Sequence, residues 1–354
     1  MNPANPLSRQ DLDSILEQTA ARWEEARGKR ILVTGGTGFF GCWLVESFCH
    51  VADVLNLGAK LVVLTRRPAE FAAKCPHILA NPNISLHGGD VRHFTSPDGE
   101  FQYVLHCAAE TTARAVADDP PSAFSTIVSG TERTLQFAVE SGVQKFLLTS
   151  SGAVYGRQPN ILTHIPETYP GAPDPLDVNG VYAEAKRAAE LLCALYAKKY
   201  GLACKIARCW AFCGPHLPLD QHFAIGNFIG DVLAGRPIEI KGDGTARRSY
   251  LYAADLAVWL WTILFRAPSL IAINVGSESD VSILELAQTV AKTLNPQAKI
   301  CISGKATPGL GPSRYVPSVD RARELLGLRE TVGLEDAIRR TADWYKWNGS
   351  HSSA

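Results

Sequence analysis

The sequence carries no excess charge, because Lys plus Arg and Asp plus Glu both number 35 among its 354 residues. Proteins that bind nucleic acid or anionic membranes through their electrostatic field carry a basic excess, so a small molecule is the expected partner. A long apolar run is also missing. The most apolar stretch, at residues 258–265, is far shorter than the roughly 20 residues of a membrane span, and the first residues contain no apolar signal core. We therefore expect a soluble, cytoplasmic protein.

Cysteine pairs at the spacing of a metal site or a redox motif are missing. The nine cysteines are scattered at positions 42, 49, 75, 107, 193, 204, 209, 213 and 301, a usage typical of a reducing compartment. Cys209 and Cys213 could be two zinc ligands, but no second Cys/His pair at zinc spacing accompanies them. Buried apolar thiols are the favoured interpretation, and we predict that the protein binds no metal.

Composition and length favour a folded α/β protein. Hydrophobic residues make up 46% of the chain, and 29 glycines and 21 prolines are too few for a disordered or fibrous protein. Short aliphatic or β-branched runs alternate with helical stretches, a pattern typical of a parallel sheet buried on both faces. The pattern predicts a Rossmann-type doubly wound sheet. The expected strands lie within residues 31–36, 61–67, 84–90, 103–109, 145–151 and 204–210.

The first expected strand leads into a glycine-rich turn. Gly35, Gly38 and Gly41 follow it directly, at the start of a helix. In a dinucleotide-binding turn the first glycine allows the tight turn, the second lets the backbone approach a pyrophosphate, and the third lets helix and strand pack closely. Because a strand precedes the turn and a βαβ rhythm follows it, we favour this function over an ordinary glycine-rich connection.

The second expected strand ends in Thr65, Arg66 and Arg67, without the acidic residue that binds the ribose 2′-hydroxyl of NAD. Two guanidinium groups favour the 2′-phosphate of NADP, because arginine matches phosphate geometry with two parallel hydrogen bonds. A solvated charged loop is the alternative. Asp90, after the third expected strand, could accept a hydrogen bond from the adenine amine or simply cap the turn.

Tyr182 and Lys186 are four residues apart in a helical stretch, so they share one helix face. An ammonium group near a phenol stabilises the phenolate and should lower a pKa that starts at about 10, making Tyr182 a usable acid and base near neutral pH. Ser151 stands at the end of the fifth strand, on the edge where doubly wound folds bind ligands. These three residues form the candidate catalytic set.

The motifs TGGTGFFG, GD at 89–90, HCAA at 106–109, TSSGAVYG and YAEAK occur in order and at the expected separations. The chain thereby resembles an extended short-chain dehydrogenase/reductase of the nucleotide-sugar epimerase/dehydratase family. The resemblance implies that Ser151 hydrogen-bonds the reacting sugar oxygen, that Tyr182 moves its proton and that Lys186 holds the nicotinamide ribose of NADP, the preferred cofactor, or of NAD. The expected cofactor contacts are Gly35, Thr37, Gly38, Phe39, Phe40, Gly41, Arg66, Arg67, Asp90, Val91, Cys107, Ala108, Ala109, Tyr182 and Lys186.

The resemblance also implies substrate contacts in the second half. Arg248 would bind the diphosphate of a nucleotide-diphosphate sugar, whereas Asp255 would be mainly structural. Ala211 stands where many relatives carry an asparagine that touches the substrate phosphate, so His222 and Asn227 are the candidates for that contact. Each of these two could instead be a helix cap or a surface group. The expected substrate-binding residues are Ser151, Ala211, His222, Asn227 and Arg248.

A second departure from the family limits the reaction. In the 4,6-dehydratases the residue matching Ser151 is followed by Asp-Glu, the acid and base for loss of water, whereas Gly152 and Ala153 follow it here. A Ser/Tyr/Lys set without that pair suits hydride transfer at one sugar carbon, C4. We expect an NADPH-dependent 4-ketoreductase of a nucleotide-linked keto sugar. The alternatives are a 4-epimerase with retained cofactor, a less favoured 4,6-dehydratase and a non-catalytic NADP-binding sensor.

Three regions are expected along the chain. Residues 1–29 form an N-terminal helical extension, because Ser8 and Asp11 stand at capping-box spacing before an amphipathic stretch that ends near residue 28. Residues 30–205 form the NAD(P)-binding Rossmann domain, and residues 206–354 form mostly a smaller substrate-binding domain interleaved with it. The family resemblance also implies a homodimer. Further helices are expected at 224–234, 281–294, 318–328 and 334–347, before a polar tail that should fray.

Overall fold

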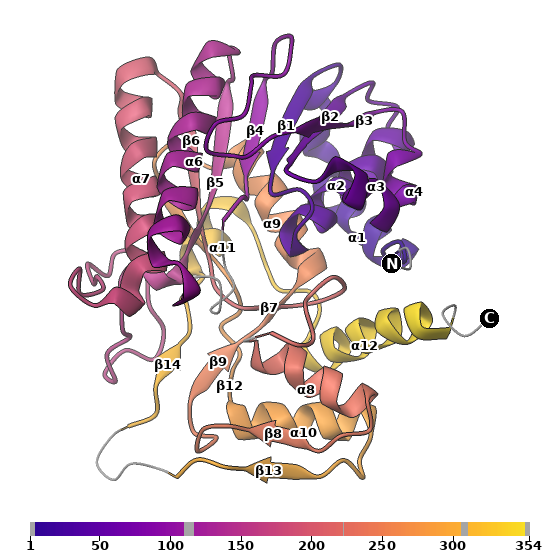
Figure 1. Cartoon of the computed structure of the whole chain (residues 1–354), viewed down its shortest axis with the longest axis vertical. Coiled ribbons are helices and arrows are strands. Elements are labelled where there is room, and N and C mark those ends of the chain that lie inside the picture. The colour runs from indigo at the N-terminus through magenta and orange to yellow at the C-terminus, as the bar shows by residue number, and fades with distance from the viewer. Residues whose placement is uncertain (1–3, 110–116, 222, 306–310, 351–354) are drawn as a thin grey trace.

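A computed structural model describes residues 4–109, 117–221, 223–305 and 311–350. Within these residues the main sheet has seven parallel strands in the order β11-β6-β5-β4-β1-β2-β3 (Figure 1). The predicted doubly wound sheet is confirmed, with one strand, β11, that the sequence pattern did not predict. The strands are β1 (Arg30–Thr34), β2 (Lys60–Thr65), β3 (Ile84–Gly88), β4 (Tyr103–His106), β5 (Lys145–Ser151), β6 (Ala203–Cys209) and β11 (Ala272–Val275).

Helices cover both faces of the sheet, because alternate residues of its strands point to opposite sides. Ile31 and Val33 of β1 belong to the core on one face, and Leu32 belongs to the core on the other. Figure 1 shows α6 and α7 side by side on one side of the sheet, with α1, α2 and α9 on the other. The bounds are α1 (Arg9–Thr19), α2 (Phe39–Val54), α6 (Pro120–Glu140), α7 (Val181–Tyr200) and α9 (Ala253–Arg266), with the short α3 (Pro68–Lys74) and α4 (Pro76–Leu79) between β2 and β3.

The N-terminal extension packs against helices on one face of the sheet. Helix α1 begins after Ser8, whose Oγ accepts the Asp11 backbone N–H, and it contacts α2 and α9. The expected single helix over residues 8–28 is instead α1 followed by a 3₁₀ segment, Ala20–Ala26. This segment buries Trp23 completely, with its ring 4.6 Å from that of Trp261 in α9. The extension is therefore part of the main core.

The second half of the chain forms a smaller lobe but returns to the main sheet through β11 (Figure 1). Small sheets pair β9 with both β12 and β14, β13 with β8, and β10 with β7. Helix α10 starts later than expected, because Ser282 and Glu285 form a capping box after a short strand. The elements are β7 (Phe212–Cys213), α8 (Ala224–Leu233), β8 (Ile238–Ile240), β9 (Arg247–Ser249), β10 (Leu251–Tyr252), β12 (Asp280–Ser282), α10 (Ile283–Leu294), β13 (Ile300–Ile302), β14 (Arg314–Tyr315), α11 (Asp320–Leu326) and α12 (Leu334–Ser350).

Helix α12 continues to Ser350, three residues beyond the end expected from the sequence. None of the helices within the described residues is long and apolar enough to cross a membrane.

Replacing Trp23 by alanine should lower the free energy of unfolding by about 3–5 kcal/mol, because a fully buried tryptophan leaves a cavity. Trp347 is 52% exposed, so Trp347→Ala, the control, should cost less than about 1 kcal/mol. Urea unfolding followed by circular dichroism measures both values. Equal stability of Trp23→Ala and the wild-type protein would show that the N-terminal extension does not contribute to the core.

Candidate active site

The turn after β1 requires glycine at two of its three motif positions. Gly35 has a φ of +69°, and a β-carbon there would lie 2.6 Å from the Ala108 backbone nitrogen. A β-carbon on Gly41 would lie 2.3 Å from the Gly35 carbonyl oxygen, so only glycine lets α2 pack this closely on the turn. Gly38, in contrast, borders open space, with no atom nearer than 3.5 Å to such a β-carbon.

The start of α2 fits a bound phosphate. Gly38 is the N-cap residue and provides no side-chain acceptor for the first-turn N–H groups of the helix. These N–H groups and the positive end of the helix dipole are the usual binding site for a dinucleotide pyrophosphate. The other predicted cofactor residues come from the turns after neighbouring parallel strands, at the same edge of the sheet. Thr37, Phe39 and Phe40 follow β1, Val91 follows β3, and Cys107, Ala108 and Ala109 follow β4.

The end of β2 presents two exposed guanidinium groups. Arg67 pairs with Glu70 at 3.2 Å, whereas Arg66 forms no ion pair with any described carboxylate. Asp90, after β3, accepts the backbone N–H of Arg92 and two hydrogen bonds from its guanidinium group. These bonds hold the pKa of Asp90 at about 2. The structure thus shows the turn-capping role that the sequence left open for Asp90, and Arg66 remains available to a phosphate.

Ser151, Tyr182 and Lys186 come together where β5 ends against the start of α7. Lys186 is 2% exposed, and its Nζ donates to the Thr149 carbonyl oxygen at 2.6 Å. Nζ lies 6.0 Å from the centre of the Tyr182 ring. The Ser151 side chain acts on the pKa of the Tyr182 phenol, so the two side chains are neighbours. An ammonium group has three N–H donors, so two remain for a ribose bound beside the pair.

The expectation that Lys186 lowers the pKa of Tyr182 is wrong for this structure. Burial raises the pKa of the Tyr182 phenol to about 12, although the neighbouring Ser151 side chain acts in the other direction. Burial also lowers the pKa of the Lys186 ammonium group to about 8. Both shifts arise because a low-dielectric interior disfavours the charged form of each group. Tyr182 is therefore a protonated phenol at neutral pH.

An aromatic wall that sequence motifs did not reveal closes the other side of Ser151. Trp210, after β6, and Tyr315 of β14 pack with their rings 4.4 Å apart. A β-carbon added to Gly152 would lie 2.6 Å from a ring carbon of Trp210 and 2.8 Å from the Tyr315 hydroxyl oxygen. No spacing rule connects residues this far apart in sequence, so only the three-dimensional fold brings them to the site.

The expected substrate residues lie in different settings. Arg248 donates to the carbonyl oxygens of Arg247 and Ser313 and forms no ion pair with a described carboxylate, so its charge is available to an anion. Ala211 accepts the Leu251 backbone N–H through its carbonyl oxygen, and Asn227 is half-buried in α8. His222 lies outside the described residues. Buried Asp255 accepts three hydrogen bonds from Thr331 and Val332, which suits a structural role.

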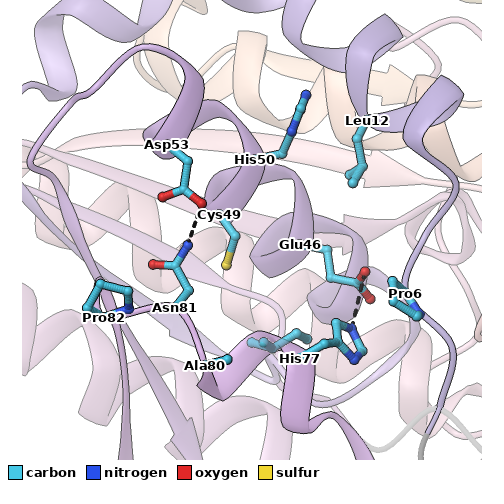
Figure 2. Close-up of a pocket in the computed structure, with 11 residues that line it drawn as sticks. Pro6, Leu12, Glu46, Cys49, His50, Asp53, His77, Ala80, Asn81 and Pro82 are labelled. Carbon is cyan, nitrogen blue, oxygen red and sulfur yellow. Dashed lines mark hydrogen bonds and ion pairs between the residues drawn. The ribbon is translucent and has the colours of Figure 1, made fainter.

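A separate pocket lies between the N-terminal segment, α2 and α4, and none of the predicted site residues lines it (Figure 2). Buried Glu46 is one of the residues that line this pocket. Its carboxylate accepts the Leu7 backbone N–H at 2.7 Å and pairs with His216 at 3.2 Å and with His77 at 3.4 Å. Burial raises the pKa of Glu46, but the two histidines outweigh it and hold that pKa below its usual value. These contacts anchor the N-terminal segment.

Comparisons with known proteins agree with this geometry. The model of the NAD dependent epimerase/dehydratase family matches residues 31–276. UDP-glucuronic acid decarboxylase 6 of Arabidopsis thaliana is 30% identical over 311 residues, 87% of this chain and 86% of that protein. A solved UDP-galactose 4-epimerase is 28% identical, with a TM-score of 0.71 over 90% of this chain and 99% of its own.

The fold is also shared with UDP-glucuronic acid 4-epimerase from Bacillus cereus, solved in complex with UDP-glucuronic acid and NAD. It has a TM-score of 0.75 over 90% of this chain and 99% of its own, and at 24% identity it is a likeness of fold alone. The family match spans the glycine turn, the end of β5 and the start of α7. The chain therefore belongs to the NAD dependent epimerase/dehydratase family, whose members are enzymes of the extended short-chain dehydrogenase type.

Proposed function

We propose that the chain transfers hydride at C4 of a nucleotide-diphosphate sugar without loss of water or carbon dioxide, as an NADPH-dependent 4-ketoreductase of a nucleotide-linked keto sugar. The observation that supports it best is the cluster of Ser151, Tyr182 and Lys186 beside Gly152, whose surroundings leave no room for an acidic side chain. Arg248, with no carboxylate partner among the described residues, is proposed to bind the diphosphate.

The side chains of the cluster divide the chemistry among them. A nicotinamide held at this edge of the sheet would supply the hydride for C4. Tyr182 gives its phenolic proton to the sugar oxygen while the hydride is added to C4, so the carbonyl group becomes a secondary alcohol. The raised pKa of Tyr182 suits this direction, because the phenol holds its proton at neutral pH. Lys186, fixed to the Thr149 carbonyl oxygen, would donate its free N–H groups to the ribose.

Elimination and decarboxylation need an acid and a base that this site lacks at the usual place. Gly152 and Ala153 have no titratable side chain, and the Trp210 ring and the Tyr315 hydroxyl fill the space beside Gly152. A 4-epimerase with retained cofactor is the second candidate, favoured by the 28% identity to a solved UDP-galactose 4-epimerase. The two functions differ in cofactor turnover, because only the reductase consumes NADPH in proportion to product.

We predict the products formed in deuterated water from UDP-glucose, UDP-galactose, UDP-glucuronic acid and the single 4-keto-6-deoxy sugar nucleotide that corresponds to both hexoses. A keto sugar should gain a hydride and a proton and consume one NADPH, and the C5 hydrogen of the unmodified sugars should stay in place. Mass spectrometry and the loss of NADPH absorbance measure both. Loss of water or carbon dioxide from an unmodified sugar would contradict the proposal, and interconversion without NADPH consumption would establish the epimerase.

Two tyrosine-to-phenylalanine variants of α7 distinguish a loss of proton transfer from a loss of folding. Tyr182→Phe should lower the rate by ~10²- to 10⁴-fold, the usual contribution of a positioned acid or base, and leave cofactor affinity nearly unchanged. Tyr196→Phe, on the same helix but farther from β5, should keep the wild-type rate. A Tyr182→Phe protein with full activity would remove this phenol from the mechanism.

A second prediction concerns cofactor choice. Arg66→Ala combined with Arg67→Ala should weaken NADP binding far more than NAD binding, because each charge-assisted contact to a phosphate contributes roughly 1.5–3 kcal/mol when ordered and less when solvated. Isothermal titration with each cofactor measures the difference. Arg339→Ala, an exposed arginine of α12, is the control. Equal weakening of both cofactors, or none, would assign Arg66 and Arg67 to surface charge.

We also propose that α6 and α7 form the interface of a homodimer. Several apolar side chains on these two helices face solvent in the single chain: Phe124, Leu191, Leu195 and Tyr200. Leu195, 53% exposed, should disrupt the dimer when it becomes glutamate, whereas Leu176→Glu, in a loop and 89% exposed, should not. Light scattering after size exclusion measures the mass. A wild-type monomer at micromolar concentration would refute the interface.

A further inference from the structure

Helix α7 carries one half of a largely buried ion pair, one turn after Lys186. The Arg208 guanidinium group of β6 donates to the Glu190 carboxylate, from Nε to Oε1 at 3.0 Å and from Nη2 to Oε2 at 2.7 Å. Only 17% of the Arg208 side chain and 16% of the Glu190 side chain are exposed. The guanidinium carbon also lies 4.7 Å from the centre of the Tyr155 ring. Two parallel bonds from a planar group give the Glu190 carboxylate a defined orientation.

The oriented carboxylate also binds β5. The Ser150 hydroxyl donates to Glu190 Oε1 at 2.5 Å. Ser150 and Arg208 are partners in the register of the parallel strands β5 and β6, so their side chains point to the same face of the sheet. Leu148 and Ile206, two residues earlier in each strand, belong to the core cluster that α7 also lines. Glu190 therefore bridges α7 and the ends of two strands.

The face of α7 that packs on the sheet gives little resistance to sliding. Ala185 and Ala189 are fully buried on this face, and alanine side chains are too short to form ridges that interlock with a facing element. A helix rises by about 1.5 Å per residue, so a slide by one residue would displace every group on the face by that distance. The axial position of α7 therefore depends strongly on its polar contacts.

Glu190 shares its helix face with two residues of the candidate catalytic set. Lys186 lies one turn earlier and Tyr182 two turns earlier. Lys186 Nζ donates to the Thr149 carbonyl oxygen at 2.6 Å and lies 6.0 Å from the centre of the Tyr182 ring. Ser150, which binds Glu190, directly follows Thr149 in β5. The Glu190 contact thus holds the helix where Lys186 reaches the strand.

We propose that Glu190 is a positioning residue: its carboxylate, oriented by Arg208, binds the Ser150 hydroxyl and sets the axial position of α7. Lys186 and Tyr182 are thereby held at the end of β5. The effect on rate rests on the hydride transfer proposed above, whereas the position of the helix does not. A purely structural ion pair would stabilise the fold without setting where Lys186 lies.

Titration of Lys186 tests the proposal without any sugar. Burial lowers the pKa of this ammonium group to about 8, below the ~10.4 of an ordinary lysine. In lysine labelled with ¹³C at the carbon beside Nζ, the NMR signal follows the titration, and Lys186→Met assigns it. Ser150→Ala keeps the ion pair of α7 but removes its bond to β5. The hydrogen bond of the Lys186 ammonium group should then weaken, and its proton affinity should fall about three- to tenfold.

Two further variants separate position from charge and from folding. Glu190→Asp keeps the negative charge but is one methylene group shorter, so it cannot reach Ser150 and Arg208 as Glu190 does and should cause the same fall. The double variant Ser150→Ala/Glu190→Asp should show no larger change than the stronger single variant. Ser47→Ala, the matched control, removes a buried hydroxyl that accepts the Trp261 side-chain N–H at 3.0 Å, and it should leave the titration unchanged.

Urea unfolding of each variant shows how much stability is lost beside the titration. An unchanged Lys186 titration in either Ser150→Ala or Glu190→Asp would overturn the proposal and leave Glu190 a structural residue. An equal fall in Ser47→Ala would also overturn it, because general loosening of the fold would then explain the effect. If the sugar screen finds no hydride transfer, the proposed function fails, but the titration still decides the role of Glu190.

Steady-state kinetics test the consequence for catalysis. On a sugar that the screen identifies, Ser150→Ala should lower kcat about five- to tenfold and leave the KM for the sugar within about twofold, because the displaced groups act in the transition state. Ser47→Ala should keep the wild-type kcat. A raised KM with an unchanged kcat would contradict the proposal, because Glu190 and Ser150 would then shape the sugar site instead of positioning the reactive groups.

Discussion

The docking of α7 on β5 is the interaction on which the candidate site depends. Two polar residues of α7, Lys186 and Glu190, each form a hydrogen bond with one of the last three residues of β5. Tyr182, four residues before Lys186, lies on the same helix face. Because these groups are largely buried, sliding the helix by one turn would leave several of them without partners. The relative placement of the reactive side chains is therefore fixed when the sheet forms. The Lys186 ammonium group donates to the Thr149 carbonyl oxygen at 2.6 Å, and the Ser150 hydroxyl donates to Glu190 at 2.5 Å.

The smaller lobe is held to this site through β11. Asn274 accepts hydrogen bonds from Tyr155 and Trp210 through one side-chain oxygen, at 3.0 and 3.2 Å, and its side-chain nitrogen donates to the carbonyl oxygens of Ile165 and Ser318. Asn274 is fully buried, so each of these bonds would be costly to lose. The wall beside Gly152 thus has a fixed orientation, and the main sheet itself supplies the anchor.

The sequence was sufficient to predict the sheet, the glycine turn and the three residues at the end of β5 and the start of α7, because each depends on a local pattern. Strand periodicity, a glycine with positive φ and a spacing of four residues are all readable within a short window. Tyr315 and Trp210 could not be found in this way, since both approach Gly152 through strand pairings between distant segments: β14 with β9 for Tyr315, and β6 with β5 for Trp210. The direction of the Tyr182 pKa shift was missed for a related reason: spacing shows that an ammonium group is near, but burial is a property of the whole fold. The turn-capping role of Asp90 followed from the sequence only as one of two alternatives, because a turn cap and a ligand contact use the same carboxylate. In the structure this carboxylate accepts hydrogen bonds from Arg92.

Gly152 carries a consequence for how this site can change. A β-carbon at this position meets an indole ring and a phenol oxygen at once, so an acidic residue introduced there is destabilising until Trp210 or Tyr315 has first been reduced in size. The effect of an acidic substitution at Gly152 depends on whether Trp210 or Tyr315 has already been replaced. The stability effects of these substitutions are strongly coupled because the three residues are in contact. A path from this site to one that eliminates water is therefore epistatic: it must begin at Trp210 or Tyr315 and reach Gly152 last.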